Sequence, residues 1–187
     1  MKEELQFMIR EGLWFQSGSA NQQGKTCLEG KLQLIEKQPL RPDDELSFAD
    51  AEYQTYITTE QIPLYRVYGQ SPSGAGAFGG GRFATTEFAE SRIDVKIRLA
   101  LKPDWKNTRL VEELILVPAG IVLQIGKVAA VTLPTGTVLE GGADQVLLPY
   151  QWPSEWIQGY REITIKPQWE YPVYAKDKPI ERLERKG

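Results

Sequence analysis

An arginine on a short β-prone run is the first residue whose type and position could do chemistry. Arg66 lies in residues 64–69, an apolar and aromatic segment typical of a strand. The glycine-rich segment 70–81 follows it. A guanidinium held rigidly there suits phosphate or carboxylate, because its fork donates two parallel hydrogen bonds. The alternative is an arginine on the solvent face of an edge strand, with its stem along a tyrosine.

The residue types that are missing narrow the chemistry further. The 187 residues include no histidine and one cysteine, Cys27. Histidine-based triads, a histidine general base and histidine zinc sites are therefore excluded, and no intramolecular disulfide can form. We expect no metal site, and we interpret Cys27 as a structural residue. Catalysis would have to rest on carboxylates, amides, hydroxyls, arginines and aromatic side chains.

Charge and hydropathy argue against two classes of partner. A net charge of -3 gives no basic footprint, so nucleic acid is not expected to bind. The longest apolar run, around residues 120–131, is interrupted by polar residues and falls short of the ~20 residues of a membrane span. The polar, acidic start has no signal-peptide core, so we expect a cytoplasmic location and no membrane association.

The strand and turn patterns predict a single α+β domain of 187 residues. Strands are predicted at 64–68, 110–117, 122–128 and 145–148, in one common, mostly antiparallel sheet. Residues 109–117 and 121–131 are expected to form a hairpin around the turn 118–120. A short strand or turn is predicted near 32–35, and one more strand near 163–165.

The remaining segments are predicted to be helical or to cover the sheet. Residues 1–14 predict an amphipathic helix, 39–44 a connector, and 46–59 a helix or a covering loop. Helix and strand patterns compete over residues 88–101; a cap at Thr85 or Thr86 favours a helix that ends before Pro103. Trp169, Tyr171 and Tyr174 are expected to pack over the sheet.

Three short motifs follow one another along the chain: Tyr65-Arg66-Val67-Tyr68-Gly69, then Phe83-Ala84-Thr85-Thr86, then Gly141-Gly142-Ala143-Asp144-Gln145. Over residues 62–149 their order resembles the ADP-ribosyltransferase-like superfamily, and more closely its bacterial polymorphic-toxin members, which include NAD-glycohydrolase toxins. Residues 1–61 would then be an N-terminal covering segment, and 150–187 a C-terminal extension. A toxin-derived chain would be delivered into a target cell.

The resemblance implies a split, mostly antiparallel sheet that grips NAD as a substrate and needs no metal. Gln145 would be the catalytic residue, hydrogen-bonding a ribose hydroxyl as the glycosidic bond breaks. Transferases usually carry glutamate there, so a neutral amide fits hydrolysis better than transfer. A protein acceptor or a cognate immunity protein would be the further partner. The cofactor-binding residues would be Arg66, Tyr68, Arg82, Phe83, Thr85 and Thr86, with Arg66 lining one cleft together with Phe83 and Gln145.

Two other readings remain open at this stage. The chain could be a catalytically inactive relative, or a protein-binding module with an aromatic-rich surface. It could also be a different enzyme that uses carboxylates such as Glu112, Glu113 and Asp144. Glu112 and Glu113 are interpreted as a charge pair and not as a catalytic dyad, because adjacent strand residues point to opposite faces.

Overall fold

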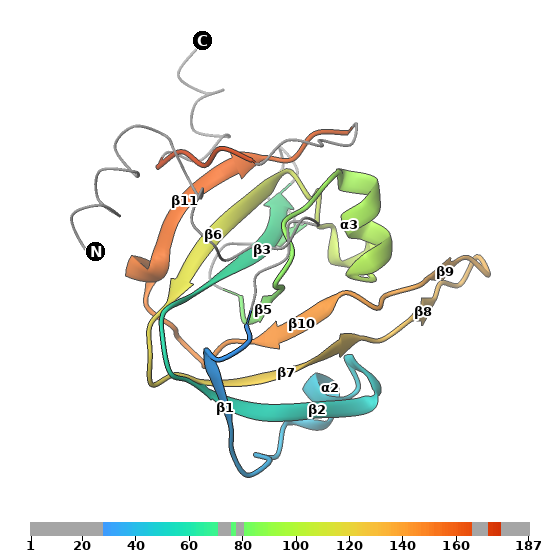
Figure 1. Ribbon diagram of the computed structural model, residues 1–187. Helices are drawn as coiled ribbons and strands as arrows, with labels where there is room; N and C mark the ends of the chain where they lie inside the picture. Colours follow the sequence, from blue (N-terminus) through green and yellow to red (C-terminus); the bar gives the residue numbers. More distant parts are fainter. Residues whose placement is uncertain (1–27, 71–75, 78–80, 166–171, 177–187) are drawn as a thin grey trace.

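The computed structural model describes residues 28–70, 76–77, 81–165 and 172–176, which form two main antiparallel sheets with few helices (Figure 1). The first sheet has the strand order β1-β2-β7-β10-β5 and the second the order β11-β6-β3-β4. Every strand pairing in this described part is antiparallel. The prediction of mostly antiparallel sheet with a few short helices is therefore confirmed.

The first sheet contains β1 (Leu32–Leu34), β2 (Phe48–Thr58), β5 (Phe83–Ala84), β7 (Val122–Val128) and β10 (Asp144–Leu147). The second contains β3 (Ile62–Gln70), β4 (Gly76–Ala77), β6 (Val111–Val117) and β11 (Ile157–Glu162). A separate ribbon pairs β8 (Val131–Thr132) with β9 (Val138–Leu139). The described residues contain the helices α2 (Pro42–Glu45) and α3 (Arg92–Arg98) and the 3-10 turns η1 (Pro103–Trp105) and η2 (Ser154–Trp156).

Two tight connections, from β2 to β3 and from β6 to β7, carry the chain from one sheet to the other. β6 pairs with β3 and β11, whereas β7 pairs with β2 and β10. The predicted hairpin of 109–117 with 121–131 is therefore wrong. So is the prediction of one sheet common to 64–68, 110–117, 122–128 and 145–148, since two of these strands lie in each sheet.

Thr58, at the end of β2, explains why the turn after β6 closes no hairpin. Its carbonyl accepts from the Gly120 amide at 2.7 Å, and its hydroxyl donates to the Pro118 carbonyl at 2.7 Å. The Ile121 amide donates to the same hydroxyl oxygen at 2.9 Å. Thr58 of the first connection thus bonds three backbone groups of the second, and the two connections are held side by side.

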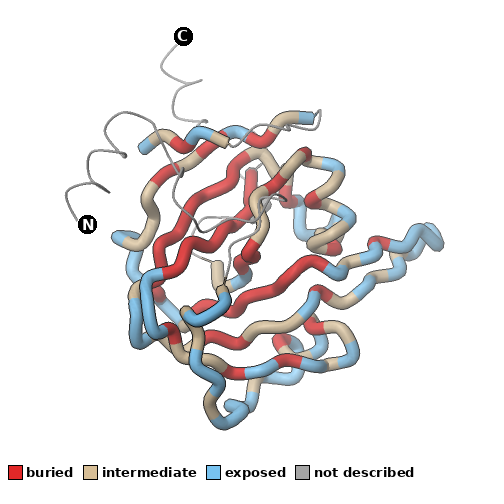
Figure 2. Tube along the Cα trace, in the orientation of Figure 1, coloured by how far each residue is buried: buried red, intermediate tan, exposed pale blue. Residues whose placement is uncertain are grey.

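The main core lies between the two sheets, and both sheets contribute buried residues to it. Figure 2 colours the buried stretches of the strands red. Alternation along β3 and β6 turns every second residue toward the first sheet. Trp152 closes this core, and its indole Nε1 donates to the Gly81 carbonyl at 3.0 Å. The buried members are Ile62, Leu64, Ala84, Ile115, Val117, Leu123, Val146, Leu148 and Trp152.

Residues 46–59, predicted as a helix or a covering loop, instead contain the whole of β2. This strand is bulged: its register against β7 shifts between Phe48 and Tyr53, and Asp50 and Ala51 adopt positive φ angles of 55° and 56°. Gly126 lies opposite the bulge, where a Cβ atom would meet the Phe48 ring at 2.6 Å. Phe48 and Tyr53 of this strand are buried and pack with Leu147.

The ambiguous segment 88–101 does contain a helix, α3, as predicted. Its N-cap is Ser91, whose hydroxyl accepts from the Asp94 amide at 3.1 Å. The predicted caps, Thr85 and Thr86, lie before it, and the Thr85 backbone pairs with that of Tyr65. α3 ends before Pro103, which opens η1.

The C-terminal part contains an edge strand, β11, which ends before the residues predicted to form it, 163–165. β11 ends at Glu162, and Ile163, where a strand had been predicted, is fully buried after it. Tyr174 packs over the sheet as predicted, stacked on Tyr65 with ring centroids 6.3 Å apart. The predictions for 1–14, Cys27, Trp169 and Tyr171 fall outside the described residues. Among the residues that are described, none of the helices has the length and apolarity needed to cross a membrane.

Candidate functional site

Arg66 lies on the face of β3 that is directed at the first sheet, two residues beyond Leu64 of the main core. It is opposite Glu113 of β6, and its Nη1 lies 3.4 Å from Glu113 Oε1. Its guanidinium carbon is 5.2 Å from the centroid of the Tyr68 ring. Gly81 lies against the guanidinium so closely that a Cβ atom there would overlap Nη2. Arg66 is thus a buried, ion-paired residue and not a fork at an open cleft mouth.

The surroundings of Arg66 fit a structural charge pair. Burial lowers the pKa of Arg66, and the neighbouring Glu113 partly offsets that shift. Burial, reinforced by the negative charge of Glu113, raises the pKa of Tyr68 far above its ordinary value. Tyr68 therefore stays neutral, and Glu113 supplies the countercharge that lets Arg66 remain charged inside the protein.

The second motif connects the two sheets. The Thr85 amide and carbonyl bond the Tyr65 backbone at 2.8 and 2.9 Å, while β5 pairs with β10 on its other side. The Thr86 hydroxyl donates to Asp144 Oδ2 at 2.5 Å, and Lys127 Nζ donates to Asp144 Oδ1 at 2.5 Å. Both threonines are buried, so their roles in the described structure are to join the sheets and to hold Asp144.

Gln145 projects from the face of β10 opposite to that of Val146, which belongs to the main core. On this outer face Leu147 packs with Phe48 and Tyr53. Gln145 Nε2 donates to the Ser47 hydroxyl oxygen at 2.7 Å. Phe83 pairs with Leu147 in the β5–β10 ladder, so Phe83 lies on the same outer face as Gln145, and it is 45% exposed.

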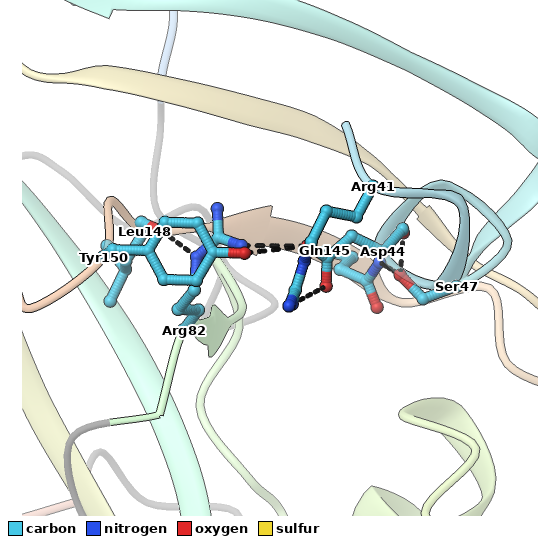
Figure 3. Close-up of polar contacts among 7 residues, drawn as sticks. All are labelled: Arg41, Asp44, Ser47, Arg82, Gln145, Leu148 and Tyr150. Carbon is cyan, nitrogen blue, oxygen red and sulfur yellow. Dashed lines mark hydrogen bonds and ion pairs between the residues drawn. The ribbon is translucent and has the colours of Figure 1, made fainter. Parts of the chain in front are cut away.

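A polar cluster centred on Asp44 covers this outer face (Figure 3). Arg82 Nη1 lies 2.9 Å from Asp44 Oδ2, and Arg82 Nε donates to the Leu148 carbonyl at 2.9 Å. Arg41 Nε and the Tyr150 hydroxyl reach the same carboxylate at 3.1 and 3.4 Å. The main-chain carbonyl of Asp44 accepts from the Ser47 hydroxyl at 2.5 Å. We call this the Asp44 cluster; its members are Arg41, Asp44, Ser47, Arg82, Gln145, Leu148 and Tyr150.

Short local structure places these groups. Pro42 occupies the first turn of α2, where its missing amide hydrogen costs nothing. Asp44 is buried within the four-residue helix, and Ser47 lies in the turn directly before β2. Burial alone would raise the pKa of Asp44, but the hydrogen bond from Arg41 and the charge of Arg82 outweigh it and hold that pKa below its ordinary value.

The residues of the Asp44 cluster range from buried to exposed, and we call its exposed side, with Arg41 and Tyr150, the rim. Gln145 and Asp44 are buried, whereas Tyr150 is 58% exposed. The Arg82 guanidinium carbon lies 3.7 Å from the Tyr150 ring centroid, and that of Arg41 lies 5.3 Å from it. A tyrosine ring flanked by two arginines is suited to anionic and aromatic groups.

Of the predicted site residues, the structure brings Arg82, Phe83 and Gln145 to one face. Arg66 and Tyr68 lie in the second sheet beside Glu113. The expected cleft shared by Arg66, Phe83 and Gln145 does not follow from the strand alternation, which directs Arg66 between the sheets and Gln145 to the outer face. Gly81 lies between the Arg66 side chain and the Asp44 cluster. It packs against the Arg66 guanidinium and directly precedes Arg82.

Sequence reasoning missed Arg41, Asp44, Ser47 and Tyr150. The signal for the first three was present, because Pro42 followed by acidic residues is a typical helix start. The segment was interpreted as a connector, since four residues carry no helical period. Nothing in the sequence indicates that Tyr150 stacks on Arg82, because that contact depends on how the chain leaves β10.

Glu112 and Glu113, considered above as catalytic carboxylates of a different enzyme, are both bonded to buried groups of the protein. Glu112 is fully buried, and its oxygens accept from Arg161 Nε at 2.5 Å, the Tyr174 hydroxyl at 2.8 Å and the Ala89 amide at 2.5 Å. Glu113 is equally buried on the other face of the sheet, beside Arg66. The two carboxylates therefore form no dyad.

A small cavity lies elsewhere, between β3 and α3. Its volume of about 20 Å³ is room for one water molecule, and Val67, Thr85 and Leu99 are among its lining residues. Arg82 and Gln145 do not line it.

The chain matches no protein-family model, and neither a curated protein nor a solved structure is significantly similar to it. Function therefore has to be inferred from the residues and their contacts.

Proposed function

We propose that this protein cleaves the nicotinamide–ribose bond of NAD by hydrolysis, as an ADP-ribosyltransferase-like enzyme. One observation carries the proposal: the Gln145 carboxamide is held on a strand by Ser47, in the same cluster as an arginine stacked on an exposed tyrosine. Such a group of side chains combines a hydrogen-bonding amide, positive charge and an aromatic platform, which match ribose, pyrophosphate and base.

Gln145 is the catalytic residue of this proposal. Loss of nicotinamide passes through an oxocarbenium-like state, in which the ribose must be held while positive charge develops. A neutral amide that hydrogen-bonds a ribose hydroxyl can do this by positioning and electrostatics, without a titrating base. Water then forms the new bond to the ribose carbon, nicotinamide departs with the electron pair of the broken bond, and the proton passes to solvent.

In this proposal Arg82 contacts the phosphates, the role predicted for Arg66. Its guanidinium is oriented by the Leu148 carbonyl and by Asp44, and Arg41 adds a second, exposed guanidinium. Asp43 and Glu45 of α2 lie beside Asp44, so the two arginines create no excess of positive charge here. The proposal rests on the hydrogen-bond donors that the two guanidinium groups would offer to a phosphate. Tyr150 and Phe83 offer exposed rings for a base.

The test is release of nicotinamide from NAD, followed by chromatography. Gln145→Ala should lower turnover by roughly 10²–10³, the typical effect of removing one preorganised transition-state donor or acceptor. Gln33→Ala, on the exposed edge strand β1 of the same sheet, is the matched control and should keep full activity. Equal release by the Gln145→Ala protein and the parent protein would rule out this site.

A protein-binding role is the second candidate, and exposed apolar residues around α3 favour it. Ile93 and Ile97 lie one turn apart on that helix, and Trp105 in η1 is 52% exposed. Two results together would favour this role. The parent protein would release no nicotinamide, and it would bind a partner protein that Ile93→Lys no longer binds but Gln145→Ala still does.

A further inference from the structure

The direction in which the Gln145 amide points can be deduced by counting protons on Ser47. A serine hydroxyl has one proton to donate and lone pairs to accept with. The Ser47 hydroxyl lies 2.5 Å from the main-chain carbonyl of Asp44, which can only accept, so the proton is directed there. Toward Gln145, at 2.7 Å, the same oxygen can then only accept.

The amide of Gln145 must therefore present its nitrogen to Ser47. Its carbonyl oxygen, Oε1, is consequently turned away from Ser47. Within the described part of the chain no hydrogen bond to Oε1 is formed, so this oxygen is available to accept a hydroxyl proton. With the opposite orientation the NH2 group would face the ligand, and a ribose hydroxyl would meet a donor.

The Asp44 carbonyl is itself held firmly. It belongs to α2 and also accepts from the Ser47 amide at 3.3 Å, while the side chain of the same residue is fixed by Arg41 and Arg82. Movement of Asp44 would thus disturb both the arginine that the proposed function assigns to phosphate and the serine that orients the amide.

We propose that Ser47 is a positioning residue, which sets the polarity of the Gln145 amide so that its carbonyl oxygen faces the ribose hydroxyl. The catalytic meaning of this inference rests on the proposed function. The hydrogen-bond polarity itself rests only on the contacts, so the two can fail separately.

The first arm of the test measures folding and needs no substrate. Urea unfolding of Ser47→Ala, Gln145→Ala and the double variant forms a double-mutant cycle. One hydrogen bond between the two side chains should appear as about a fivefold coupling in the unfolding equilibrium constant. Ser154→Ala, at an exposed serine in η2, should show no coupling with Gln145→Ala.

The second arm measures nicotinamide release. Ser47→Ala should lower kcat about tenfold and leave KM within twofold, because the amide loses its alignment while the phosphate contacts remain. Ser47→Thr keeps the hydroxyl and should recover most of the loss, which a packing role for Ser47 would not explain. Ser154→Ala should match the parent protein.

The outcomes separate the two ideas. The positioning role alone would be overturned if the parent protein releases nicotinamide but the cycle shows no coupling. It would also be overturned if Ser47→Thr lowers kcat as much as Ser47→Ala does. If the cycle shows coupling but the parent protein releases no nicotinamide, the proposed function is overturned, and with it the catalytic role of Ser47. The hydrogen bond between Ser47 and Gln145 would still stand.

Discussion

Glu112 and Glu113 are neighbours on β6 that point to opposite faces of the second sheet, and each is ion-paired with a different buried arginine. Glu113 lies against Arg66 on the face directed at the first sheet, and Glu112 against Arg161 on the other. Both carboxylates are fully buried. The sheet thus carries one compensated charge pair on each face, and neither pair tolerates loss of one partner.

Replacing Glu113 by glutamine should destabilise the fold by about 3–5 kcal/mol, because it leaves the Arg66 charge buried without its carboxylate. Urea unfolding measures this. Glu162→Gln, which removes the half-exposed partner of Arg92, is the matched control and should cost less than about 1 kcal/mol. Similar values for the two variants would contradict the structural role assigned to the buried pair.

Arg66→Met should act on stability and not on recognition of NAD. The variant leaves Glu113 without its arginine, so thermal unfolding should occur at a lower temperature, while KM for NAD should stay unchanged in the folded fraction. Arg82→Met should show the reverse pattern, a higher KM with a smaller loss of stability. A raised KM for Arg66→Met at unchanged stability would return the phosphate contact to Arg66.

Thr58→Val should cost about 1–3 kcal/mol. The substitution keeps the shape of the side chain but leaves the Pro118 carbonyl and the Ile121 amide without their hydroxyl partner. The adjacent Thr59 is exposed, and its hydroxyl makes one hydrogen bond, to the Gly30 carbonyl at 3.2 Å. Thr59→Val should therefore change the free energy of unfolding by less than about 1 kcal/mol. Equal losses of stability in the two variants would argue that the Thr58 hydroxyl does not hold the two connections together.

The stabilising effect of Asp44 should disappear in acid. Its pKa in the folded protein lies below the ordinary value of 3.8, so its carboxylate stabilises the fold above that value. The effect should be lost as the pH falls through the lower, folded-state pKa. The difference in urea midpoint between the parent protein and Asp44→Asn should therefore be largest near pH 7 and shrink below about pH 4. Asp43→Asn, at the exposed neighbour, should show little difference at either pH.

Nicotinamide release should be nearly flat between pH 5 and pH 9. An amide does not titrate in this range, and the chain contains no histidine. Rates at saturating NAD, measured on protein shown by circular dichroism to stay folded, check this. A bell-shaped profile within that range would indicate an acid or base other than Gln145.

Strands rich in β-branched and other apolar residues were the easiest elements to predict. The segments that became β3, β6, β7 and β10 are β-prone runs with a proline or glycine near at least one end, and they were found within two residues of their ends. Their pairing was not found, because a short turn such as 118–120 is equally compatible with a hairpin and with a crossing to another sheet. The choice depends on Thr58, which lies about 60 residues earlier in the chain.

The site was predictable only in part. Strand alternation alone separates Gln145 from Val146, but which of the two faces the main core depends on the partners of β10. The burial of Arg66 required knowing that Glu113 lies opposite it, a pairing between residues 47 positions apart. The ion pair of Arg82 with Asp44 of α2 could not be predicted, because it joins residues 38 positions apart.

The two connections clamped by Thr58 also have a kinetic consequence. Since β2 and β3, like β6 and β7, are consecutive yet lie in different sheets, neither main sheet can begin from a hairpin closed by these turns. Each must wait for strands distant in the chain, and such non-local pairing raises the contact order of the fold. Folding is therefore expected to be slow for a chain of this length, with strand edges open to other chains until both sheets have closed.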